Sequence, residues 1–209
     1  MTKYIAFDSE TGGLDCHKNP ILTAYFAALD KDLNILGELD LLIRPDAQYP
    51  FIDPGAMEVN KIDLEAHNLD PRSLSRQEAG MALQAFLAKY GGKNSRDKNR
   101  PKPLGHNVGF DLGFKGQIIA EQDWSKHVHY SSICTKVITD FFKDCGIFPD
   151  HVGNLGSLVK YFNIKERPAH NAKEDTLMMI DVYGKIMEVA KSFGSGSSIS
   201  LDLLSMLEK

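Results

Sequence analysis

Apolar residues concentrate in three early segments of the chain. The segments are rich in β-branched, aromatic and leucine residues and cover 3–8, 21–29 and 35–44. Turn residues such as "GGLD" and "DKDLN" separate them. Segments of this composition, bounded by glycine, aspartate and asparagine, are typical of strands. The short connections predict an antiparallel meander.

The pattern changes to helical spacing from residue 56 onward. A strong helix is predicted near 73–90, where Ser73 or Ser75 can cap the first turn and "ALQAFLAKY" supplies the apolar stripe. Strands and helices then alternate, with strands near 103–107 and 127–131 and helices near 109–121, 132–144, 154–162 and 171–192. Strands joined first by turns and later by helices predict an α/β fold with a mixed sheet and helices on its faces.

The length of 209 residues and the apolar share of 43% fit one domain. We expect this domain to cover 1–191. It is followed by a Gly/Ser-rich stretch at 192–199, typical of a flexible linker, and by a short amphipathic segment at 200–209.

The cysteines and the charge limit the classes of function. Cys16, Cys134 and Cys145 are odd in number and lack C-x-x-C spacing, which favours reduced thiols and a cytoplasmic protein. No apolar run approaches the roughly 20 residues that span a bilayer, so no membrane association is expected. The net charge of −4 argues against coating nucleic acid by charge alone. A partner with phosphates would need a local basic patch or metal ions.

One basic patch is present in the sequence. Residues 91–103, "GGKNSRDKNRPKP", carry five basic residues against Asp97 alone. Charge runs are usually solvated surface, and a nucleic-acid contact is the alternative.

Four acidic residues lie at the ends of predicted core elements. Asp8 and Glu10 end the first strand, two apart and therefore on the same face. Asp111 begins a helix after a strand, and Asp175 lies at the start of the last long helix. Brought together, four carboxylates would repel one another unless cations neutralised them. Oxygen ligands without cysteine partners indicate magnesium or manganese.

A histidine accompanies the last acid. His170 and Asp175 are five residues apart, so they could not face one point if both were helical. Asn171 and Glu174 have the spacing of an N-cap and its reciprocal acid. With Asn171 as the cap, His170 lies on the entering loop and can lean over the helix start.

Three motifs carry a specific resemblance. "FDSETGGLD", "GHNVGFD" and "HNAKED", in this order, resemble the exonuclease motifs of the DEDD superfamily. The spacing of His170 and Asp175 resembles the histidine-containing, DnaQ-like branch (DEDDh). This branch includes the proofreading epsilon subunit of bacterial DNA polymerase III, exonuclease X and RNase T. The resemblance runs from about residue 3 to 187 and includes "PGAMEVNKI".

The resemblance implies an RNase H-like fold with a mixed five-stranded sheet flanked by helices. It also implies a 3′–5′ exonuclease that releases nucleoside 5′-monophosphates from DNA with two divalent ions, Mg²⁺ or Mn²⁺. Asp8, Glu10 and Asp175 would hold one ion, Asp8 would bridge to the second ion beside Asp111, and His170 would be the general base. A related exoribonuclease and a non-catalytic nucleic-acid-binding module remain alternatives.

The resemblance extends to neighbouring positions. Leu14 and Phe110 resemble residues that pack against the terminal base, with core packing as the alternative for Phe110. Asn107, with His106, either shapes the turn before the helix or contacts substrate. Ser9 stands where threonine is commoner, and its side chain is expected to point away from the metal ions.

Two further features are weaker. His127 and His129 alternate in a predicted strand and could form a zinc pair, but no third ligand is near, which favours a surface face. In the tail, 200–204, "SLDLL", resembles the clamp-binding peptides of bacterial replication proteins, with Ser200 in place of Gln and Leu204 in place of Phe. The tail therefore predicts either a tether to a sliding clamp or polymerase, or an amphipathic turn that packs on the domain or on a second copy.

Overall fold

Three long strands form the centre of the computed structural model, which describes residues 1–194. They are β1 (Tyr4–Thr11), β2 (Ile21–Leu29) and β3 (Ile35–Ile43), and each pairs antiparallel with the next. The predicted meander is confirmed. β1 continues beyond residue 8, because the acidic end of the segment still pairs with β2 through Thr11.

Three short strands complete a six-stranded sheet of order β4-β3-β2-β1-β5-β6. β4 (Ser73–Leu74), β5 (Lys102–Gly105) and β6 (Ile133–Cys134) each pair in parallel with a neighbour. The mixed α/β fold is confirmed, whereas the expected number of five strands is wrong. β4 and β6 have two residues each, too few for alternation to reveal them.

The predicted strand at 127–131 is wrong. Its first residue ends the helix α5 (Glu121–His127), whose Trp124 is buried in the core. The alternation of His127 and His129 around the buried Val128 resembles a strand, but it marks the end of a helix and the start of a loop.

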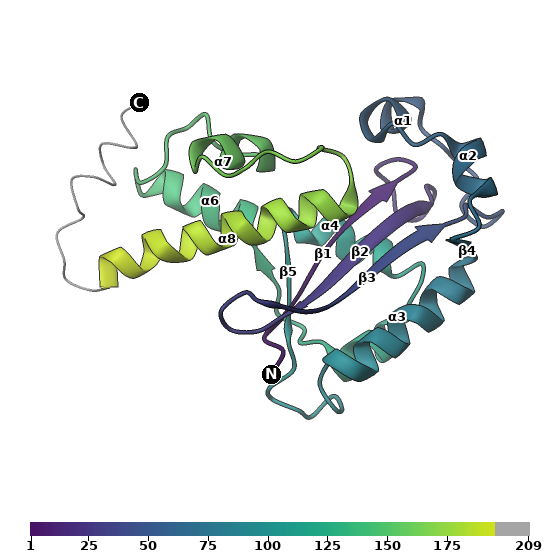
Figure 1. Cartoon of the computed structure of the whole chain (residues 1–209), viewed down its shortest axis with the longest axis horizontal. Helices are drawn as coiled ribbons and strands as arrows, with labels where there is room; N and C mark the ends of the chain where they lie inside the picture. Colours follow the sequence, from purple (N-terminus) through teal and green to yellow (C-terminus); the bar gives the residue numbers. More distant parts are fainter. Residues whose placement is uncertain (195–209) are drawn as a thin grey trace.

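Helices cover both faces of the sheet (Figure 1). The long α8 (Ala172–Gly194) lies against β1 and β2, and α6 and α7 pack on α8. On the other face, α3 packs on β3 and α4 packs on β1. The remaining bounds are α1 (Pro54–Asn60), α2 (Leu64–Leu69), α3 (Arg76–Tyr90), α4 (Val108–Lys115), α6 (Thr135–Asp144) and α7 (Leu155–Tyr161).

Helix starts and stops follow local chemistry. The helix predicted at 73–90 begins at Arg76, because Ser75 and Glu78 form a capping box. The helix predicted at 109–121 is shorter, since α4 stops at Gly116. The Gln117 side chain then donates to the carbonyls of Cys16 and Asn19, which fixes the following loop against the start of β2.

β1 is buried on both faces because its side chains alternate. Ile5 and Phe7 belong to the core with α3, α4 and α5. Tyr4 and Ala6 belong to the core with α8. The period of two therefore places the even positions Asp8 and Glu10 on the face covered by α8.

The end of the chain lies largely outside the described residues. α8 runs to Gly194, three residues into the expected linker 192–199. The rest of that linker and the segment 200–209, with its clamp-like peptide, are not among the described residues. Within residues 1–194, no helix has the length and apolar character needed to cross a membrane, and the three cysteines are free thiols.

Substitutions on α3 can test directly which side of this helix packs on the core. Leu83→Ala should lower the free energy of unfolding by about 2 to 5 kcal/mol, because Leu83 is fully buried in this core. Met81→Ala is the control on the same helix, since Met81 is 55% exposed, and its change should stay within about 0.5 kcal/mol. Urea unfolding measures both, and equal losses would contradict the assigned face of α3.

Candidate active site

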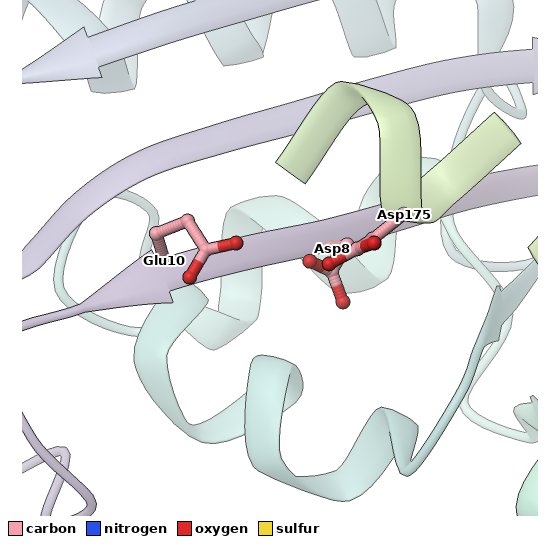
Figure 2. A group of neighbouring side chains, drawn as sticks. All are labelled: Asp8, Glu10 and Asp175. Carbon is pink, nitrogen blue, oxygen red and sulfur yellow. The ribbon is translucent and has the colours of Figure 1, made fainter. Parts of the chain in front are cut away.

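Three carboxylates meet where β1 passes beneath the start of α8. Asp8 and Glu10 come from β1, and Asp175 comes from the first turn of α8. Each residue offers one oxygen, and these oxygens lie within 4.8 Å of one another. Figure 2 shows the Asp8 and Asp175 carboxylates together beside β1, with the carboxyl group of Glu10 turned toward them. Strand periodicity and the position of one helix start therefore assemble the group.

The start of α8 is fixed by its own side chains. Asn171 Oδ1 accepts hydrogen bonds from the backbone N–H groups of Lys173 and Glu174, at 3.1 and 3.2 Å. The predicted cap at Asn171 is thus confirmed. Glu174, expected as the reciprocal acid of this cap, pairs instead with Arg167, Nη1 to Oε2 at 3.4 Å. This pair ties the loop before the helix to its first turn.

His170 lies on that entering loop, as expected. Its backbone has a left-handed φ of 61°, and its N–H donates to Asp175 Oδ2 at 3.1 Å. Its side chain is exposed. The chain therefore reverses direction at His170 and places this residue directly beside one of the converging acids.

Asp111 approaches from the opposite face of β1. It lies in the first turn of α4 and is only 3% exposed. Ser9 Oγ donates to Asp111 Oδ1 at 2.6 Å. Ser9 faces away from Asp8 and Glu10, as strand periodicity requires, and its hydroxyl contacts Asp111 instead. Periodicity along β1 could not show that Asp111 would reach Ser9 from α4.

Burial raises the pKa values of all four acids, and the charges of the neighbouring site acids add to this effect at Asp8 and Glu10. Burial, followed by the charges of Asp111, Glu10 and Asp175, raises the pKa of Asp8 well above its ordinary value. The same two causes raise the pKa of Glu10 to about 7. Burial raises the pKa of Asp111 to about 7 against the lowering effect of the Ser9 hydroxyl, and it also raises the pKa of Asp175. The ionised site therefore lacks a compensating positive charge.

The donor set fits a hard divalent cation. All the converging ligand atoms are carboxylate oxygens, which magnesium and manganese prefer. A cation between them would remove the repulsion that raises their pKa values. Asp8, Glu10 and Asp175 are the residues that could share one ion, and Asp111 acts electrostatically on both Asp8 and Glu10.

A cavity of about 330 Å³ adjoins the acids. Glu10, Leu14 and Phe110 line it, and Leu14 is 83% exposed. Phe110 also packs against Phe114 at a ring-centroid distance of 4.9 Å, which supports core packing, while its contact with a terminal base stays a prediction. Asn107 is not among the lining residues. It adopts φ 61° at the start of α4 without a side-chain cap bond, which supports its role in the turn.

Sequence reasoning missed the contribution of α1 to this cavity. Val59, which is 52% exposed, and the buried Asn60 line the side facing β1. Asn60 Nδ2 donates to the Thr11 carbonyl at 3.1 Å and so anchors α1 to the end of β1. The signal was present in "PGAMEVNKI", which the resemblance included without assigning roles to these residues.

The other histidines have separate structural partners. His127 Nδ1 lies 2.7 Å from the Gly92 carbonyl, and His129 Nδ1 accepts from the Ser131 N–H at 3.0 Å. They are not part of the acidic cluster found within residues 1–194. His106 Nδ1 lies 2.9 Å from Thr135 Oγ1, and burial lowers the pKa of His106 to about 4. His106 is therefore neutral near pH 7.

Solved structures of exonuclease I are similar to this chain. One has a TM-score of 0.71 and 16% identity and covers 90% of this chain and 41% of that chain. Exonuclease I from Methylocaldum szegediense has a TM-score of 0.70 and 18% identity, with coverages of 90% and 41%. The E. coli enzyme in complex with a dT13 oligonucleotide has a TM-score of 0.67 and 16% identity, with coverages of 89% and 41%.

The chain thus spans about two fifths of the length of these structures. No protein-family model matches the chain, and no curated protein matches it either. The similarity shows the fold, so the expected RNase H-like exonuclease fold is confirmed.

The acidic cluster predicts a pH-dependent stability. Glu10 has an ordinary pKa of 4.5 and a pKa of about 7 in the folded chain, so the folded state holds this proton more tightly. The resulting stability is present below the ordinary pKa and is lost as the pH rises through about 7. In chelator, urea unfolding at about pH 8 should therefore give a lower free energy than at about pH 5.

Magnesium should reverse this loss, by about 2.7 kcal/mol at a concentration of 100 times its dissociation constant. Asp8→Asn should weaken both effects, whereas Asp150→Asn, at an exposed turn, should not. A stability that neither falls with pH nor responds to magnesium would contradict the cation site.

Proposed function

We propose that this chain is a metal-dependent 3′–5′ exonuclease that releases nucleoside 5′-monophosphates from single-stranded DNA. The observation that carries the proposal is the convergence of the Asp8, Glu10 and Asp175 oxygens within 4.8 Å. The fold supports it, because it is shared with exonuclease I, including the form solved with dT13. The 3′–5′ polarity of digestion rests on the resemblance of the three motifs to the DEDD exonucleases.

The four acids would divide between two divalent ions, Mg²⁺ or Mn²⁺. Asp8, Glu10 and Asp175 would hold one ion, and Asp8 with Asp111 would hold the other. Such a pair, when bound, supplies an activated water and stabilises the leaving oxygen of a phosphodiester. Ser9 orients the Asp111 carboxylate through its hydrogen bond at 2.6 Å and keeps one oxygen of that acid directed toward β1.

His170 acts as the general base that takes the proton from the attacking water. Its exposed side chain has access to solvent, and its N–H bond to Asp175 ties the loop to the acidic site. The Arg167–Glu174 pair restricts the same loop from its other side. A positioned histidine contributes about a hundred- to ten-thousand-fold to such a reaction.

The cavity beside the acids receives the terminal nucleoside. Leu14 and Phe110 offer apolar surface to the base, and Glu10 lies in the wall next to the acidic cluster. Aromatic stacking is tolerant of base identity because every base has a π-face. This cavity therefore suits an enzyme that shortens ends of any sequence.

Removal of one acid tests the catalytic proposal. Asp8→Asn should abolish release of mononucleotides from a 5′-labelled oligonucleotide in magnesium, because the shared ligand of both ions is lost. Asp150→Asn, at an exposed position, should retain full activity. Unchanged hydrolysis in Asp8→Asn, or in excess chelator, would contradict a metal-dependent reaction.

The same assay distinguishes the alternatives. Single-stranded DNA, duplex DNA and RNA are compared, and a 3′-phosphate should block digestion. Faster digestion of RNA would favour an exoribonuclease, binding without hydrolysis would favour a non-catalytic module, and cuts in a circular single strand would contradict an exonuclease.

The general base has its own test. His170→Ala should lower kcat by about a hundred- to ten-thousand-fold while DNA binding changes little. His151→Ala is the matched control, because His151 is exposed on a distant turn. Single-turnover kinetics separate chemistry from binding, and wild-type turnover in His170→Ala would make His170 a structural residue only.

A further inference from the structure

A second cleft lies at the opposite end of the sheet. It encloses about 530 Å³ between the residues before β1, the turn from β2 to β3, and the segment that leads into β5. Its lining contains five cationic side chains and two carboxylates, namely Lys3, Lys31, Lys98, Arg100, Lys102, Asp30 and Asp32. The chain as a whole has a net charge of −4, so this concentration of positive charge runs against its composition.

The two carboxylates are already engaged in the β2–β3 turn. Asp30 accepts bonds from the backbone N–H groups of Asp32 and Asn34, at 2.8 and 2.9 Å, and from Asn34 Nδ2. Asp32 pairs with Lys31 at 2.7 Å. They hold the turn and one lysine, and no ion pair joins them to the remaining cations of the cleft within residues 1–194.

Three lysines of the cleft therefore keep free ammonium groups. Within the described part of the chain, Lys3, Lys98 and Lys102 form no salt bridge, and each ammonium offers three donors. Arg100 differs, because its guanidinium donates to the carbonyls of Ser125 and Val128 and its Nε donates to the Asp97 carbonyl. Arg100 adds charge while it fixes the loop.

The backbone at Lys3 and Lys102 is fixed by hydrogen bonds. The Lys3 N–H donates to the Leu29 carbonyl at 2.6 Å, and the Lys102 N–H donates to the Lys3 carbonyl at 3.0 Å. The His129 N–H donates to the Pro101 carbonyl at 2.9 Å. Binding here would order lysine side chains but not the chain, which lowers its entropic cost.

The cleft is remote from the acids. Five residues of extended chain separate Lys3 from Asp8, a distance of about 17 Å. Figure 1 shows the start of the chain at the end of the sheet away from the β1 arrowhead. A phosphate held by these lysines is therefore not the one that reacts beside Asp8 and Asp175.

We propose that this cleft binds backbone phosphates of the same nucleic-acid strand whose 3′ end lies at the acidic site. The identity of the occupant rests on the proposed function, whereas the positive charge of the cleft is independent of that function. A free nucleotide would offer the same phosphate chemistry, so the test includes it. Within 91–103, the proposal assigns the contact to Lys98 and Lys102 and excludes Lys93 and Arg96, which do not line the cleft.

Two double variants test this assignment in an Asp8→Asn background, in which binding is measured without hydrolysis. Lys98→Ala with Lys102→Ala changes the cleft. Lys93→Ala with Arg96→Ala removes the same charge from the same loop outside the cleft. Fluorescence anisotropy follows labelled oligothymidylates of about four and about sixteen nucleotides over a range of salt concentrations.

The cleft variant should bind the longer strand about tenfold more weakly, and the slope of log affinity against log salt should decrease by about 1.4, since two phosphate contacts are lost. The loop variant should change the affinity for the longer strand by less than about twofold. The affinity for the short strand should be the same in both variants. Equal effects of the two variants would reduce the cleft to diffuse surface charge and overturn the proposal.

Inorganic pyrophosphate and a nucleoside monophosphate serve as competitors, because a free nucleotide is the alternative occupant of the cleft. If these competitors bind through Lys98 and Lys102 while the affinity for the longer strand is the same in the cleft variant, the strand is not the occupant and the proposal is overturned. Hydrolysis enters none of these measurements. If the exonuclease proposal is wrong, the binding comparison can therefore still be interpreted. If the cleft does not bind the strand, the results of the nuclease assays are unaffected.

Discussion

Repulsion among carboxylates is the constraint on which the arrangement of this protein depends. Burial raises the pKa values of all four acids, repulsion adds to it at Asp8 and Glu10, and the pKa values of Glu10 and Asp111 reach about 7. In a less rigid fold, the carboxylates could move apart and so reduce this electrostatic cost. β1 cannot move, because Ile5 and Phe7 fix it to one helical layer while Tyr4 and Ala6 fix it to α8. The free energy can then fall by protonation of the acids or, at higher pH, by binding of cations, and the binding of cations is the basis of the proposed chemistry.

The charge of the molecule is divided along β1. The acids lie toward its carboxyl end, and the cleft with Lys3, Lys98 and Lys102 lies at its amino end. In the proposed function, cations mediate contact with the reacting phosphate, whereas the lysines contact phosphates further along the strand directly. This separation makes the proposed binding of nucleic acid compatible with a net charge of −4, because neither contact requires a basic surface overall.

Much of the fold could be predicted from local patterns. The three long strands follow from their β-rich composition and the turn residues between them, and the start of α8 follows from Asn171, whose side chain caps the helix. The errors fall where local patterns carry little information. β4 and β6 are two residues long and exist because a neighbouring strand pairs with them. At 127–131, a buried Val128 between two histidines imitates a strand, although it follows the end of α5.

The sequence by itself determined the kinds of residue in the site and the direction each takes from its own element. It placed Asp8 and Glu10 on one face of a strand and His170 on the loop before a helix. Only the tertiary structure decided which of these directions converge. The contact of Ser9 with Asp111 joins residues 102 positions apart, and α1 and the basic cleft are likewise assembled from distant segments. Periodicity acts over a few residues, whereas such distances depend on how whole elements pack.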